Sequence, residues 1–147
     1  MKILIDADGC PVVDCCVNIA QQYGLPCLIL CDTAHEITRT GAETHIFATG
    51  ADSVDYALVN LTVQGDIVIT QDYGLAAMCL ARLAKPMDQN GQIYDDNNID
   101  ALLLARHTAR KIRSSGGKLT GPKKRKPEQD TRFAQALIKL IEDRDSD

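Results

Sequence analysis

Aspartates stand where two short apolar runs of the sequence end. Asp6 and Asp8 follow the run Ile3–Ile5. In the same way, Asp72 follows the run Ile67–Thr70. Side chains alternate along a strand, so Asp6 and Asp8, which are two residues apart, can point to the same side. Because the ligands of an open parallel sheet bind beyond the carboxyl ends of its strands, these aspartates are candidates for a binding site.

Asp52 and Asp55 form a further acidic pair at the start of an expected helix. Residues three apart lie on one face of a helix, and this pair follows an expected strand, Thr44–Ala48. Capping is an alternative role for Asp52 and Asp72, because aspartate is a good helix N-cap. Asp6 differs from both, since a carboxylate that directly follows an aliphatic strand is costly to bury without a partner.

Carboxylates that converge in this way need a cation. Two of them ~4 Å apart repel by roughly 4 kcal/mol at an effective dielectric constant near 20. Mg²⁺ and Mn²⁺ are hard ions that bind carboxylates and water, and two such ions can orient a water and stabilise the leaving oxygen of a phosphodiester. The expected metal ligands are Asp6, Asp8, Asp52, Asp55 and Asp72, and the expected catalytic residues among them are Asp6, Asp8 and Asp72.

Other residues with ligand atoms fit structural roles better. Asp66 precedes its strand, so it belongs at the opposite edge of the sheet, where we expect a turn residue. Cys10 lies beside Asp8, and a packed cysteine is a better interpretation than an activated thiol at a helix N-terminus. The histidines lack metal-site spacing and are expected to be structural: His35, His45 and His107. Surface positions are expected for Asp88, Asp95, Asp96 and Asp100.

Positive charge is concentrated in one stretch of an otherwise acidic chain. Between Ala101 and Pro127 there are nine Lys and Arg and no Asp or Glu, while the whole chain carries −4, which leaves −13 for the rest. Lys and Arg can bind phosphates while the carboxylates bind cations, so this distribution suits an anionic substrate. A solvated loop is the alternative. The residues expected to bind nucleic acid are Lys118, Lys123, Lys124, Arg125, Lys126 and Arg132.

Length and composition indicate a single globular domain, residues 1–147. The chain is 45% hydrophobic and 24% charged, and with 4% aromatic residues and no Trp its core must be aliphatic. No apolar run approaches the ~20 residues of a membrane-spanning helix, and no signal-peptide pattern opens the chain, so we expect no membrane partner and a cytoplasmic location. The six cysteines are expected to be reduced, because a domain of this size does not need disulfides.

Apolar runs alternate with helical patterns in the first half of the chain. The expected strands are Ile3–Ile5, Cys27–Cys31, Thr44–Ala48 and Ile67–Thr70. The expected helices extend from Pro11 to Gly24, over Val54–Leu61, and from Gln71–Gly74 to about Ala84. This alternation predicts a three-layer α/β fold, a parallel sheet of four to five strands with helices on both faces.

The second half of the chain is expected to form a small hairpin and two C-terminal helices. Asn90-Gly91 is a strong signal for a two-residue hairpin turn within Pro86–Tyr94. Asn98 is expected to cap a helix that runs through Arg113. Residues 114–129 are predicted to be a basic flexible loop, and Asp130 is expected to open the last amphipathic helix.

Three segments of the chain resemble the YaiI/YqxD family of uncharacterised bacterial proteins. They are Ile5–Val12 (IDADGCPV), Gly65–Asp72 (GDIVITQD) and Thr120–Lys123 (TGPK), and the resemblance runs nearly end to end. The family in turn looks like a branch of the PIN-like nucleases, whose fold is a parallel sheet with helices and whose acidic residues bind Mg²⁺ or Mn²⁺ to cleave RNA or DNA. The resemblance implies metal-binding roles for Asp6, Asp8, Asp52, Asp55 and Asp72.

Our main hypothesis is a metal-dependent nuclease, a phosphodiesterase that acts on RNA or single-stranded nucleic acid. One alternative is a non-catalytic RNA-binding or regulatory PIN-like module that keeps a structural metal. Another is a phosphohydrolase of the haloacid-dehalogenase type, because Asp6–Gly9 (DADG) resembles the Asp-x-Asp-Gly opening of that class. The alternative has less support, since 147 residues leave little room for the cap domain of such enzymes.

Overall fold

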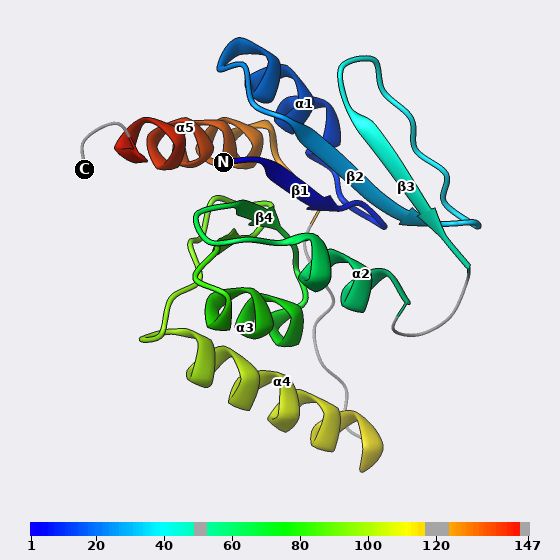
Figure 1. Cartoon of the computed structure of the whole chain (residues 1–147). Helices are drawn as coiled ribbons and strands as arrows, with labels where there is room; N and C mark the ends of the chain where they lie inside the picture. Colours follow the sequence, from blue (N-terminus) through cyan, green and yellow to red (C-terminus); the bar gives the residue numbers. More distant parts are fainter. Residues whose placement is uncertain (49–52, 117–123, 145–147) are drawn as a thin grey trace.

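The computed structural model of the chain describes residues 1–48, 53–116 and 124–144 (Figure 1). Its strands are β1 (Ile3–Asp6), β2 (Cys27–Asp32), β3 (Glu43–Phe47), β4 (Ile67–Ile69) and β5 (Lys85–Met87). Its helices are α1 (Val13–Gln22), α2 (Ser53–Leu61), α3 (Tyr73–Ala81), α4 (Ile99–Ser114) and α5 (Pro127–Asp143). Strands and helices alternate as predicted, except that β3 follows β2 with no helix between them.

β1 is the central strand of a parallel sheet with the order β3-β2-β1-β4-β5. It pairs with β2 on one side and with β4 on the other, so that Ile5 lies between Ile29 and Ile69. A central strand needs apolar side chains on both faces, and Ile3, Leu4 and Ile5 provide them with no exposed surface. The parallel sheet predicted from the continuous apolar runs is confirmed.

Helices cover both faces of this sheet and form a three-layer structure (Figure 1). Ile5 packs in one core with residues of α1 and α5, such as Phe133. Leu4 packs in a second core with residues of α2 and α3, such as Leu58. Because side chains alternate along a strand, Asp6 lies on the same face as Leu4, toward α2 and α3. The face on which the candidate site lies therefore follows from the position of β1.

Two predicted boundaries are wrong. The last helix begins at Pro127 and not at Asp130, so the predicted loop over residues 114–129 ends earlier. Proline is favoured in the first helical turn, where its missing N–H costs nothing, and Gln129 Oε1 accepts a hydrogen bond from Lys126 N at 2.7 Å. α3 ends at Ala81 instead of Ala84, because the chain turns there and enters β5.

The predicted hairpin is present, although its first arm is also the edge strand β5. Met87 pairs with Ile69 in the parallel sheet and forms an antiparallel bridge with Ile93. At the turn, Gly91 has a φ of 86°, and a Cβ atom there would lie 2.9 Å from the carbonyl oxygen of Arg132 in α5. Glycine thus allows both the turn and the close approach of α5 to the hairpin.

In the described part of the chain, no helix is long and apolar enough to cross a membrane.

At the amino edge of the sheet, Asp66 is 1% exposed and accepts hydrogen bonds from the backbone N–H groups of Lys2 at 3.0 Å and Val63 at 2.9 Å. The Lys2 ammonium group also donates to Asp66. Asp66 precedes β4 as predicted, and its carboxylate joins the start of β1 to the turn before β4.

We expect Asp66→Ala to lower the free energy of unfolding by about 3 kcal/mol, because it leaves two backbone donors and a partly buried ammonium group without an acceptor. Asp66→Asn keeps one acceptor oxygen and should lose less. Urea denaturation followed by circular dichroism measures both values. Asp96→Ala is the control, since Asp96 is exposed and should change stability by only about 0.5 kcal/mol. Equal losses in Asp66→Ala and Asp96→Ala would contradict this role.

Candidate active site

Asp6 ends the central strand, where its carboxylate is held by the residue that follows β4. Thr70 Oγ1 donates a hydrogen bond to Asp6 Oδ2 at 2.8 Å and accepts one from the backbone N–H of Asp72 at 3.0 Å. Thr70 is 2% exposed, and its carbonyl oxygen accepts a hydrogen bond from the Tyr94 hydroxyl at 3.1 Å. The Thr70 hydroxyl therefore connects Asp6 with the start of α3, a positioning role that the sequence analysis missed.

Burial raises the pKa of Asp6 to about 6, well above the ordinary value of 3.8. The hydrogen bond from Thr70 lowers this pKa, whereas the negative charges of Asp55, Asp8 and Asp72 raise it further. The charges of these three carboxylates therefore lie near enough to act on Asp6 at the carboxyl edge of the sheet. That Asp6, Asp8, Asp55 and Asp72 share a metal ion stays a prediction.

Asp72 has two structural contacts in addition to its place near Asp6. Its Oδ1 accepts hydrogen bonds from Gly74 N at 2.9 Å and Leu75 N at 3.2 Å, so Asp72 is the N-cap of α3. The same oxygen lies 3.3 Å from Nη1 of Arg106 in α4. The capping alternative is confirmed, and among the described residues these contacts leave Oδ2 of Asp72 available for a further ligand.

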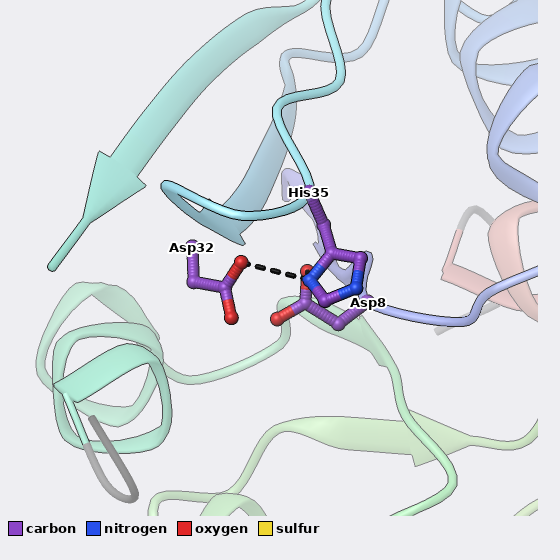
Figure 2. Close-up of side chains that lie close together, drawn as sticks. All are labelled: Asp8, Asp32 and His35. Atoms are coloured by element: carbon purple, nitrogen blue, oxygen red, sulfur yellow. Dashed lines mark hydrogen bonds and ion pairs between the residues drawn. The ribbon is translucent and has the colours of Figure 1, made fainter. Parts of the chain in front are cut away.

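Asp8, Asp32 and His35 form a second group, which Figure 2 shows. One potential ligand atom from each of the three residues lies within 4.8 Å of the others. His35 Nδ1 is 2.9 Å from Asp32 Oδ1 and 3.8 Å from Asp8 Oδ1. The hydrogen bond with Asp32 raises the pKa of His35, and the same bond lowers the pKa of Asp32. The prediction that His35 is only structural overlooked this group.

A signal for Asp32 was present in the sequence. Asp32 ends β2 directly after an apolar run, as Asp6 ends β1. Asp6 is in register with Leu30, so Asp32, two residues further, lies on the same face of the sheet. The rule that identified Asp6 applies to Asp32 without change. The position of His35 depends on the loop after β2 and has no such signal.

Asp8 Oδ1 is shielded from solvent and has no hydrogen-bond partner among the described residues. Buried carboxylate oxygens are nearly always satisfied by a donor or a cation.

Asp52, Lys118 and Lys123 lie outside the described residues, so their predicted roles stay predictions. Asp55 lies in the first turn of α2, on the side of the sheet toward which Asp6 points.

A basic groove adjoins the acidic hollow. The acidic hollow is lined by Asp6, Asp8, Cys10, Ile69, Thr70, Gln71 and Gln89. The basic groove is lined by Gln71, Gln89, Asn90, Lys124, Arg125, Lys126, Gln129 and Arg132. Gln71 and Gln89 line both, so the two hollows are adjacent, and the Gln71 amide donates a hydrogen bond to Gln89 Oε1. Four of the six predicted nucleic-acid-binding residues lie in this groove.

Arg125 joins the two walls of the basic groove. Its Nη1 lies 2.8 Å from Asn90 Oδ1 and its Nη2 lies 2.8 Å from the carbonyl oxygen of Gln89, both in the hairpin. Its Nε lies 2.7 Å from Asp130 Oδ1 in α5. Every guanidinium nitrogen thus has a partner in the protein, whereas Lys124, Lys126 and Arg132 are exposed. The predicted contact of Arg125 with nucleic acid stays a prediction.

Cys10 lines the acidic hollow, and burial raises the pKa of its thiol. A raised pKa keeps the thiol protonated at neutral pH, which fits a packed cysteine better than an activated nucleophile. This supports the interpretation preferred from the sequence.

At pH 7.5 in EDTA, Asp6→Asn should have a higher free energy of unfolding than the unaltered chain, because it removes a buried negative charge. The gain is at most about 3 kcal/mol, since the pKa of Asp6 rises from 3.8 to about 6 on folding and one pKa unit corresponds to about 1.36 kcal/mol. The folded chain holds the Asp6 proton more tightly than the unfolded chain, so the stability contributed by this group is greatest below pH about 4 and is lost as the pH rises through about 6. The difference should therefore vanish near pH 4. Urea denaturation at both pH values measures it, with Asp96→Asn as the control. A difference independent of pH would contradict the assignment.

Known proteins similar to the chain identify its family. The model of the family described as "Uncharacterized BCR, YaiI/YqxD family" matches residues 4–143. A UPF0178 protein of Exiguobacterium sibiricum is 49% identical over 141 residues, which is 96% of each chain. A UPF0178 protein of Clostridium acetobutylicum is 46% identical over 143 residues, 96% of this chain and 97% of the relative. No solved structure matches the chain. The chain therefore belongs to the YaiI/YqxD family, as its motifs predicted.

Proposed function

We propose that the protein is a metal-dependent phosphodiesterase that cleaves RNA or single-stranded nucleic acid. The observation that carries this proposal is the group of carboxylates around Asp6, which lies next to a groove lined by Lys124, Lys126 and Arg132. A negative site that can hold a cation next to a positive groove suits a phosphodiester, because the groove holds the backbone while the cation acts on one phosphate.

The carboxylates fit Mg²⁺ or Mn²⁺ in their chemistry. Asp6 is destabilised by burial and by its neighbours' charges, and Asp8 Oδ1 accepts no hydrogen bond among the described residues, with His35 Nδ1 3.8 Å away. A cation would relieve both costs, and hard divalent ions prefer carboxylate oxygens. When bound, such an ion activates a water and stabilises negative charge on a phosphate. The proposed ligands are Asp6, Asp8, Asp55 and Asp72, with Asp52 and the neighbouring Asp32 as further candidates.

The remaining residues of the site have positioning roles in this proposal. Thr70 donates to one oxygen of Asp6, so the carboxylate keeps a constant orientation. Arg106 and the first turn of α3 hold Oδ1 of Asp72, which directs its other oxygen to a ligand. Arg125 joins the hairpin to α5, and the exposed cations beside it hold phosphates.

A non-catalytic RNA-binding module is the second candidate function, and one contact favours it. The guanidinium group of Arg106 lies 3.3 Å from Asp72, so the protein itself neutralises one carboxylate of the group. With this contact the site has less need of a second cation, which a hydrolytic reaction at two metals would use. Salt-dependent RNA binding without turnover would distinguish this function from the first.

The purified protein should cleave a mixed pool of single-stranded RNA in the presence of Mn²⁺, and Asp6→Asn should reduce the rate at least a hundredfold. The reason is that the variant removes a proposed ligand and preserves the shape and the hydrogen bond to Thr70. Gel electrophoresis of end-labelled RNA measures the rate. Asp96→Asn removes an exposed carboxylate away from the site and should cleave normally. Equal rates for Asp6→Asn and the unaltered protein would disprove the proposal.

Mn²⁺ should raise the melting temperature of the protein by roughly 5–10 °C at about a hundredfold excess over the dissociation constant, because a ligand that binds only the folded state stabilises it by about 2.7 kcal/mol there. Asp8→Asn should lose most of this shift, while Asp96→Asn should keep it. Differential scanning calorimetry with and without Mn²⁺ makes the comparison. A shift that is the same in all three proteins would show that the ion binds elsewhere.

A further inference from the structure

The second half of α4 extends beyond the rest of the fold next to the carboxylate site. Near its start, Leu103 packs with residues of α3, and one turn later Arg106 contacts Asp72 at the N-terminus of α3. The helix then continues past α3, on the side toward which the strand arrows point (Figure 1). Every residue from Arg110 to Gly116 is exposed. This half of α4 makes no core, so burial does not explain its length.

The exposed half of α4 carries a stripe of arginines and no acidic residue. Arg106, Arg110 and Arg113 are spaced i, i+4 and i+7, which places them along one face of the helix. At 1.5 Å per residue the stripe is about 10 Å long. It starts at the contact between Arg106 and Asp72 and leads away from the site. Lys111 is also exposed but lies on a different face of α4.

The stripe begins at a hollow that adjoins the acidic hollow. A hollow lined by Asp6, Gln71, Asp72, Tyr73 and Arg106 shares Asp6 and Gln71 with the acidic hollow. The acidic hollow in turn shares Gln71 and Gln89 with the basic groove. Positive side chains therefore lie in two places beside the acidic hollow: those of the basic groove, and the α4 stripe that begins at Arg106.

We propose that Arg106, Arg110 and Arg113 of α4 form a second binding surface for the backbone of single-stranded nucleic acid. A strand held in the basic groove crosses the carboxylates and continues along α4, so that protein contacts lie on both sides of the phosphate at the site. The inference rests on the proposed function and adds to it a path for the substrate. Guanidinium groups suit this role because they bind phosphate oxygens with two donors at once.

Binding of labelled single-stranded RNA of increasing length to the full chain tests this path. Fluorescence anisotropy in EDTA, in the Asp6→Asn background, measures the dissociation constant without cleavage. Affinity should rise with length until the strand spans both surfaces. Arg110→Gln/Arg113→Gln should bind long RNA at least tenfold more weakly and short RNA unchanged. A plot of the logarithm of the association constant against the logarithm of the salt concentration has a negative slope. The magnitude of this slope should fall by about 1.4 in the double variant, since it loses two phosphate contacts and each contributes about 0.7 on a single strand.

Lys111→Gln is the matched control, because it removes an exposed charge from the same helix on another face. Glutamine has nearly the helix propensity of arginine and lysine, so all variants should keep α4, which circular dichroism checks. The inference is overturned if Arg110→Gln/Arg113→Gln binds long RNA as Lys111→Gln does, or loses affinity equally at every length. An acidic peptide that displaces long RNA fully, and whose binding requires Arg110 and Arg113, would also overturn the inference. The stripe would then be a site for a protein partner.

The outcome is separable from that of the proposed function. If the protein with Asp6 intact cleaves no RNA, but length-dependent binding still requires Arg110 and Arg113, the phosphodiesterase proposal fails and the second surface stands. If the protein cleaves RNA and both arginine substitutions leave long-RNA affinity unchanged, the phosphodiesterase proposal stands and the second surface fails.

Discussion

The carboxylate of Asp6 is the last side chain of a strand that is otherwise wholly buried, and most of the site depends on it. β1 is central because its apolar residues suit both faces of the sheet, and Asp6 follows them directly. Burial makes its charge costly, and three neighbouring carboxylates increase the cost. Thr70 offsets only part of it through one hydrogen bond. The negative charge of Asp6 is therefore only partly compensated by the described residues.

The protein's own donors balance the negative charge of some of these carboxylates and not of others. Asp72 is balanced by the first turn of α3 and by Arg106, whereas Asp8 Oδ1 has no donor among the described residues. His35 stands between Asp8 and Asp32, where its proton and a cation would compete for the same oxygens. The site is thus partly satisfied by the protein, which fits the reversible binding of an ion.

The buried aspartates at the two edges of the sheet differ in the donors and charges that surround them. At the amino edge, Asp66 accepts from Lys2 and Val63, so its charge stabilises the fold. At the carboxyl edge, Asp6 receives one hydroxyl donor and several like charges. The contrast arises because the carboxyl ends of parallel strands lie at the same edge of the sheet. The residues that follow these strands, many of them aspartates, therefore lie at that edge. Stability and the candidate function are therefore placed at opposite ends of the strands.

The sequence by itself determined the layers, the parallel sheet and the edge at which Asp6, Asp8 and Asp72 lie, because apolar periodicity and the alternation of strands with helices are local properties of the chain. Asp32 followed the same pattern and could have been predicted. Only the tertiary structure decided which side chains meet Asp6 and its neighbours. Strand order and helix packing bring Thr70 to Asp6 and Arg106 to Asp72, across 64 and 34 residues of sequence, and no local pattern encodes such contacts.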